Sequence, residues 1–127
     1  MQLRGVSEGR AGLVLVNRQT SQTISSSVEV AATRRSRRRG LLGRAGMDPS
    51  EALILAPCCA IHTAFMRFAI DVVFVDARGR VLKIVRDLPP WRMAIAPRAH
   101  AVIELAAGSL KARDLKVGDA VDLAPAA

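Results

Sequence analysis

Aromatic residues, acidic residues, cysteine and histidine are all scarce in this sequence of 127 residues. Aromatic side chains make up only 3% of the chain, with no Tyr, so the core must be built from Val, Leu, Ile and Ala. No apolar run approaches the roughly 18 residues that a membrane span requires. We therefore expect a soluble, cytoplasmic, single-domain protein that does not associate with membranes.

The two cysteines, Cys58 and Cys59, are adjacent in the sequence. Neighbouring cysteines can bridge only through a distorted peptide, and such a bridge links no distant parts of the chain. The sequence therefore has no intrachain disulfide framework, which is typical of a reducing compartment.

Acidic residues are too few to balance the basic ones: the net charge is +8 and the pI is about 11.2. Six of the nineteen basic residues fall between positions 34 and 44, namely Arg34, Arg35, Arg37, Arg38, Arg39 and Arg44. No aromatic residue within this cluster could stack on bases. We therefore expect an anionic small molecule or an acidic protein segment as the partner, and we do not expect specific binding of nucleic acid.

Short apolar runs between turn residues predict a mainly β (α+β) fold in residues 13–127, preceded by a loose N-terminal arm in residues 1–12. About seven short strands, with turns every eight to twelve residues, favour a small barrel-like or rolled sheet, antiparallel or mixed, with one basic helix at its side. These strands are drawn from nine candidate segments, which are 13–17, 28–32 (with 20–27 as an edge strand or hairpin return), 51–56, 61–63, 71–76, 80–85, 92–96, 101–105 and 120–123. One or two helical turns are expected in residues 109–115.

The basic helix is predicted for residues 34–42. Thr33 can cap its first turn, and Gly43 stands where a C-terminal cap belongs. Leu41 and Leu42 would face the core, and the arginines would repel one another on the outer faces. No acidic residue is near them in the sequence to relieve this repulsion.

The order of these elements resembles the family known as domain of unknown function 192. The resemblance covers about residues 28–124. It rests on the Arg-Gly-Leu-Leu-Gly-Arg segment at 39–44, the segment from Ile61 to Asp76, Gly79, the Glu-Leu-Ala-Ala-Gly segment at 104–108 and Gly118-Asp119. It implies a compact, barrel-like, mainly β fold with the helix packed at one side, and it supplies no catalytic residue. The chain departs from the family pattern at Ala69 and Ala106, which are usually Pro, and at Arg38, where an acidic residue is common.

Polar side chains set singly among apolar neighbours mark the candidate binding site. Arg67 lies between Phe65 and Phe68, where a guanidinium needs an acceptor, and Asp71 is the local candidate. One interpretation is a salt bridge that pins the loop to the barrel. The other is an anion pocket formed by Arg67 and the arginine-rich helix, because Arg grips carboxylate and phosphate groups through two hydrogen bonds.

Glu104 lies inside the apolar segment Ala-Val-Ile-Glu-Leu, so a buried carboxylate there needs a partner such as Arg44 or Arg39. The complete set of predicted ligand-binding residues is His62, Thr63, Arg67, Asp71, Arg39, Arg44 and Glu104.

Cys58, Cys59 and His62 form an incomplete zinc-binding pattern, with His100, Asp71 or Asp76 as further ligands. Cys58 and His62 could also act as nucleophile and base. Buried free thiols and a satisfied core histidine explain the same residues, and we predict no metal, no cofactor and no catalytic residue.

The sequence therefore favours a non-enzymatic binding module. The alternatives are a hydrolase-type enzyme that uses His62 and Asp71, with or without Cys58, and a structural or assembly partner that docks through its basic helix.

Overall fold

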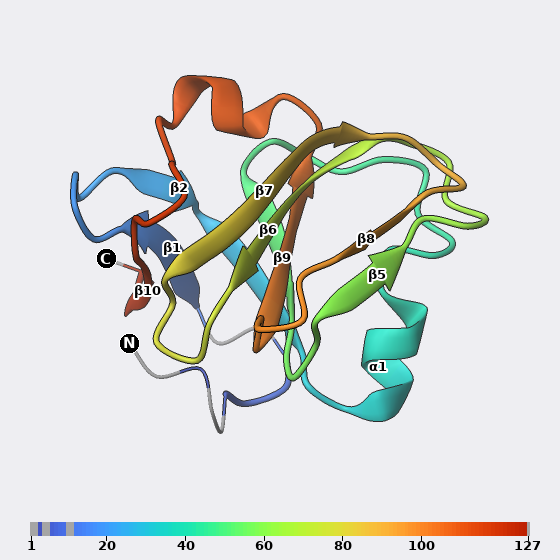
Figure 1. The fold of residues 1–127 in the computed structure, drawn as a ribbon, viewed down its shortest axis with the longest axis horizontal. Coiled ribbons are helices and arrows are strands. Elements are labelled where there is room, and N and C mark those ends of the chain that lie inside the picture. The colour runs from blue at the N-terminus through green and yellow to red at the C-terminus, as the bar shows by residue number, and fades with distance from the viewer. Residues whose placement is uncertain (1–2, 4–5, 10–11, 127) are drawn as a thin grey trace.

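The structure, a computed structural model, describes residues 3, 6–9 and 12–126. Within them the chain forms ten β-strands, one short α-helix and one 3-10 helix, and the strands make three sheets. In chain order the elements are β1 (Leu13–Asn17), β2 (Thr23–Ser25), β3 (Ser27–Ala31), α1 (Arg34–Arg39), β4 (Glu51–Leu55), β5 (Ala60–His62), β6 (Ile70–Val75), β7 (Val81–Leu88), β8 (Met93–Ile95), β9 (Ala101–Ala106), η1 (Ser109–Ala112) and β10 (Val121–Pro125) (Figure 1).

A mixed sheet of five strands, in the order β3-β4-β9-β6-β7, forms the centre of the molecule. β3 and β4 run parallel, and the other neighbours are antiparallel. Every residue of β6 and β9 is buried, because both faces of the sheet are covered. Their apolar runs are therefore nearly continuous instead of alternating with polar residues.

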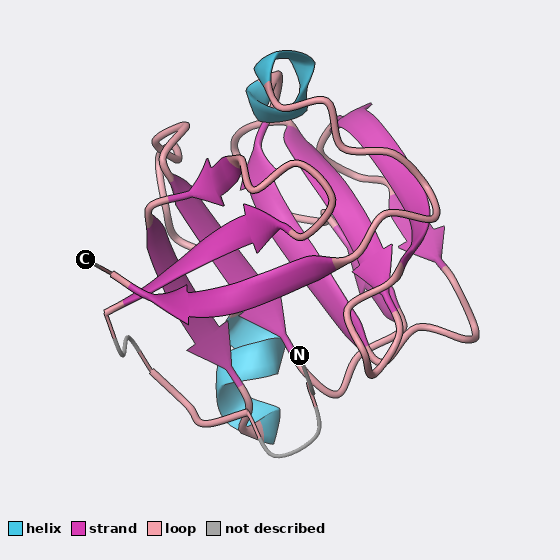
Figure 2. Cartoon of the chain, turned by 90° about the vertical axis from the view of Figure 1, so that its left-hand side faces the viewer, coloured by secondary structure: helices cyan, strands magenta, loops and turns pink. Residues whose placement is uncertain are grey.

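One face of the central sheet packs against a three-stranded sheet in the order β10-β1-β2. Leu15, Ile24 and Val121 of this second sheet share one core cluster with Val73 and Ile103 of the central sheet. Figure 2 shows this layer crossing in front of the central strands, with η1 above and α1 below. The larger apolar core of the protein lies between these two sheets.

The other face is covered by the two-stranded sheet β5-β8 and by α1 with the segment that follows it (Figure 1). Leu41, Ile61 and Met66 pack here against Val72 and Val102 of the central sheet. Strand residues alternate between the two faces. Glu104 therefore shares this face with Val102 and points away from the larger core.

The basic helix α1 begins where Thr33 and Ser36 form a reciprocal capping box. The carboxylate of Glu8 accepts hydrogen bonds from the amides of Ala32 and Thr33 and from the hydroxyl of Ser36. The acid that supports the helix start thus comes from the N-terminal segment. The helix ends at Gly40, three residues before the predicted cap at Gly43, because Gly40 has a φ of 48°.

The predicted mainly β fold with a mixed sheet and one basic helix at its side is confirmed. The strands are more numerous than predicted and form three sheets without closing into one barrel. Of the segment predicted as a loose arm, Leu3 is buried in the core, and Gly9 bridges to Val30. These described residues are therefore attached to the domain, while residues 1, 2, 4, 5, 10 and 11 lie outside the described part of the chain.

Candidate functional site

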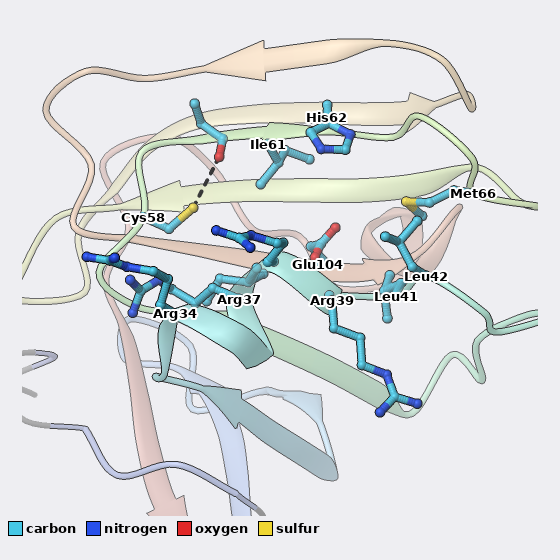
Figure 3. Close-up of a pocket in the computed structure, with 14 residues that line it drawn as sticks. Arg34, Arg37, Arg39, Leu41, Leu42, Cys58, Ile61, His62, Met66 and Glu104 are labelled. Carbon is cyan, nitrogen blue, oxygen red and sulfur yellow. Dashed lines mark hydrogen bonds between the residues drawn. The ribbon is translucent and has the colours of Figure 1, made fainter.

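A cavity of about 340 Å³ lies between α1 and the β5 strand, above the central sheet (Figure 3). We call it the α1 cavity. Its lining residues come from the helix, from the segment that follows it, from the β5 region and from β9. They are Arg34, Arg37, Arg38, Arg39, Gly40, Leu41, Leu42, Leu55, Cys58, Ala60, Ile61, His62, Met66 and Glu104.

Arginines form the helical wall of the α1 cavity. Arg34, Arg37 and Arg38 share one face of α1, because residues three and four apart are neighbours on a helix. Arg37 is half-buried and donates a hydrogen bond to the carbonyl oxygen of Ala32 at 2.8 Å. The side chain of Arg39 points away from Glu104 (Figure 3) and also lines a second cavity on the β3 side of the helix.

Glu104 is the acidic residue of the α1 cavity. It occupies the middle of β9, directly opposite Leu53 of β4 and Val72 of β6, and is only 3% exposed. Its carboxylate accepts no hydrogen bond from any residue that the structure describes. Burial raises the pKa of Glu104 to about 7, and the charge of Arg44 opposes this rise.

Arg44 does not contact Glu104 as a partner, although the sequence analysis offered this pairing. Its guanidinium binds Glu29 at 2.9 Å and Glu51 at 3.5 Å, at the edge of the sheet. Arg39, the other predicted partner, has no ion pair with any described residue. The expected structural ion pair for Glu104 is therefore absent from the described structure.

Cys58 lies in the same cavity, and its thiol donates a hydrogen bond to the carbonyl oxygen of Ala60 at 3.1 Å (Figure 3). Burial raises the pKa of Cys58. The negative charge of Glu104 adds to the rise, whereas the positive charge of Arg37 opposes it. His62 is exposed at the end of β5, with Nδ1 accepting a hydrogen bond from the amide of Ala64 at 3.3 Å.

The predicted salt bridge between Arg67 and Asp71 is wrong. Arg67 is exposed and has no hydrogen-bond or ion-pair partner among the described residues. Asp71 is buried, and its two carboxylate oxygens accept hydrogen bonds from the backbone amides of Asp87, Gly108 and Leu110. From its position in β6, Asp71 thus holds the turn before η1 and the last residues of β7 in place.

Thr63 also has a structural role and lies outside the α1 cavity. Its buried hydroxyl donates to the carbonyl oxygen of Pro89 at 2.6 Å and accepts from the amide of Arg92 at 2.9 Å. Of the seven predicted binding residues, the structure brings together His62, Arg39 and Glu104 in the α1 cavity. Arg44 lines the second cavity, and Thr63, Arg67 and Asp71 line neither.

The metal and hydrolase alternatives find little support in this geometry. In the described part of the chain, no three His, Cys, Asp or Glu side chains converge as a possible metal site. Both cysteines are free thiols. Asp71 is committed to three backbone amides, so it cannot orient His62 as a catalytic base would require.

Gly40, the residue at which α1 ends beside Glu104, was not among the predicted site residues. A β-carbon at this position would lie 3.8 Å from Oε1 of Glu104. The glycine between the arginine run and two leucines was visible in the sequence. The sequence does not show that Gly40 has a positive φ. This conformation is seen only in the structure, where Gly40 ends α1.

Neither α1 nor any other helix in the described residues has the length and apolar composition that a transmembrane span needs. The mainly β fold of this chain is also found in solved structures of other proteins. A crystal structure from Sinorhizobium meliloti, of a protein described as a candidate transcription regulator, matches with a TM-score of 0.79 at 21% identity, over 93% of this chain and 96% of that one. A protein of unknown function from Novosphingobium aromaticivorans matches with a TM-score of 0.76 at 21% identity, over 89% of this chain and 84% of that one. At this identity the two structures show the fold alone.

This chain belongs to the DUF192 family, described as "Uncharacterized ACR", whose model matches residues 14–123. A UPF0127 protein of Pyrococcus abyssi is 33% identical over 86% of this chain and 96% of its own length. A UPF0127 protein of Thermococcus sibiricus is 30% identical over 86% of this chain and 73% of its own length. The resemblance inferred from the sequence is therefore confirmed.

Proposed function

We propose that this protein is a non-enzymatic binding module that holds a small anionic molecule in the α1 cavity. A volume of about 340 Å³ is within the range of small-molecule pockets, which run from about 300 to 1,000 Å³. A small molecule fits this space better than an acidic protein segment does. The free thiols of Cys58 and Cys59 are consistent with action in the reducing cytoplasm.

The observation that carries this proposal is the set of arginines on the cavity side of α1. Arg34 and Arg38 have no hydrogen bond or ion pair with any described residue, and α1 contains no acidic residue. Arg37 uses one nitrogen on the carbonyl oxygen of Ala32. Arg37 interacts with the charge of Glu8 at the helix start, whereas Arg34 and Arg38 on the same face have no carboxylate partner among the described residues.

A bound anion would relieve the mutual repulsion of these arginines. Like charges three and four residues apart destabilise a helix by a few tenths of a kcal/mol per pair. Guanidinium groups bind carboxylate and phosphate through two parallel hydrogen bonds, which gives geometric specificity as well as affinity. The half-buried position of Arg37 adds strength, because a partly desolvated charge is less screened by salt.

The test is calorimetric titration of the purified protein with small carboxylates and inorganic phosphate, compared with the double variant Arg34→Ala/Arg38→Ala. We expect the double variant to bind at least tenfold more weakly. The matched control is Arg35→Ala, since Arg35 is an exposed arginine on the same helix that lines neither cavity. This control should retain affinity within about twofold.

Equal losses in the double variant and in a double variant Arg35→Ala/Arg78→Ala of the same net charge would overturn the proposal. Arg78 is exposed in the turn between β6 and β7, away from the α1 cavity. In that outcome the anions respond only to the overall positive charge, and the cavity has no part in their binding.

A further inference from the structure

The wall of the α1 cavity opposite the arginines holds a carboxylate that the anion proposal does not explain. Glu104 is 3% exposed, and no described residue donates a hydrogen bond to it. An ionised carboxylate that is largely buried without a donor is costly, since no hydrogen bond from the protein replaces most of the water it has lost. A ligand that supplies a donor at this point would remove the cost.

The charged and titratable groups around Glu104 come from two sides. Arg37 of α1 and Arg44 after it lie on the helical side, and Cys58 and His62 lie on the β5 side. Of these, Arg44 is the charge that lowers the pKa of Glu104, and it is already bound to Glu29 and Glu51. Burial keeps the pKa near 7, so Glu104 exchanges its proton close to neutral pH.

The guanidinium groups of α1 and the carboxylate of Glu104 lie beyond ion-pair distance, since no ion pair joins them among the described residues. The Cys58 thiol lines the same cavity, and its pKa is raised by the charge of Glu104 and lowered by that of Arg37. Leu41, Leu55, Ile61 and Met66 supply an apolar lining to the same space.

We infer that the ligand of the α1 cavity is a dipolar molecule of the ω-amino carboxylate class. Its anionic end contacts the arginines of α1, its apolar chain lies along the leucine, isoleucine and methionine side chains, and its ammonium group binds the carboxylate of Glu104. This inference rests on the proposed function for the anionic end of the ligand.

An ammonium group suits Glu104 better than a hydroxyl group does. Hydrogen bonds between two charged groups are roughly twice as strong as neutral ones, and the gain increases in a site that excludes water. An α-amino acid is a poorer match, because it carries both charges next to a single carbon. A chain between the charges lets one molecule contact the arginines and Glu104 at the same time.

The test uses four probes: ω-aminohexanoate, ω-hydroxyhexanoate, hexanoate and glycine. Calorimetric titration at pH 8, where Glu104 is ionised, should show ω-aminohexanoate binding at least tenfold more tightly than hexanoate. The variant Glu104→Gln keeps the shape of the side chain but not its charge. It should bind ω-aminohexanoate and hexanoate within about twofold of each other, while the arginine-dependent affinity for hexanoate remains.

A second measurement reports on position within the cavity. In a Cys59→Ala background Cys58 is the only thiol, and its rate of alkylation by iodoacetamide gives its accessibility. Saturating ω-aminohexanoate should slow this alkylation at least fivefold in the Cys59→Ala variant that retains Glu104. In the variant Cys59→Ala/Glu104→Gln the same concentration should slow it less than twofold.

The outcomes separate this inference from the proposed function. If ω-aminohexanoate and hexanoate bind equally, and Arg34→Ala/Arg38→Ala weakens both, the inference fails and the proposed function stands. Equal binding of ω-hydroxyhexanoate and ω-aminohexanoate overturns the ammonium contact, and tighter binding of glycine overturns the separation of the charges. If none of the probes binds, and inorganic phosphate does not bind either, both proposals fail.

Discussion

The carboxylate of Glu104 lies beneath Gly40, the residue at which α1 ends. A β-carbon at position 40 would come 3.8 Å from Oε1 of Glu104 and 3.7 Å from the carbonyl oxygen of Arg37. The backbone at Gly40 has φ 48° and ψ −124°, a conformation that L side chains rarely adopt. One glycine therefore both ends the helix and lines the cavity beside its acidic residue.

Replacing Gly40 by alanine should destabilise the protein by about 1–3 kcal/mol, the usual cost of a non-glycine residue in such a conformation. Urea unfolding followed by circular dichroism measures this loss. Gly46→Ala is the matched control, since Gly46 has no positive φ and a β-carbon there would meet nothing within 4 Å. This control should change the free energy of unfolding by less than about 1 kcal/mol. A Gly40→Ala protein as stable as the control would contradict the role assigned to this backbone.

The raised pKa of Glu104 predicts how stability depends on pH. In the unfolded chain this carboxyl group titrates near 4.5, whereas in the folded protein its pKa is about 7. Below pH 4.5 both states are protonated, and Glu104 costs nothing. As the pH rises from 4.5 to 7 the unfolded state releases its proton first, so the free energy of unfolding falls, and above about pH 7 it levels off. The two pKa values correspond to a loss of roughly 3 kcal/mol.

Glu104→Gln should remove this part of the pH dependence, because glutamine does not titrate. The measurement is the difference in free energy of unfolding between the variant and the wild-type protein from pH 4 to pH 8. It should grow in favour of the variant up to about pH 7 and then stay constant. Other carboxyl groups, such as Asp122 with its pKa lowered to about 2 by Arg18, contribute equally to both proteins and cancel. A difference that does not change with pH would show that Glu104 keeps its ordinary pKa.

The sequence predicted the strands well because each strand is marked by a local run of apolar residues between turn residues. The limits of β1 agree with the prediction, and β6 and β9 differ by one residue, because their long apolar runs have no helical periodicity. The partners of the polar residues were predicted less well, since pairing depends on distant segments. Glu8 supports the helix start from 25 residues away, and Asp71 binds amides 16 to 39 residues further along. The sequence predicted an anion pocket formed by Arg67 and the arginine-rich helix; the structure has a cavity beside this helix, and Arg67 does not line it.

Variants at Asp71 and Arg67 test directly whether these two residues form a salt bridge. Asp71→Ala should lower the free energy of unfolding by about 3 kcal/mol, because a buried amide left without an acceptor costs about 1–3 kcal/mol and two partly buried amides add smaller losses. The amides of Asp87, Gly108 and Leu110 all lose their acceptor in this variant. Arg67→Ala should change stability by less than about 0.5 kcal/mol, as expected for an exposed side chain without a partner. Urea denaturation of both variants and of the double variant gives the coupling between the two positions, which should be near zero. A coupling above about 1 kcal/mol would restore the salt bridge between Arg67 and Asp71.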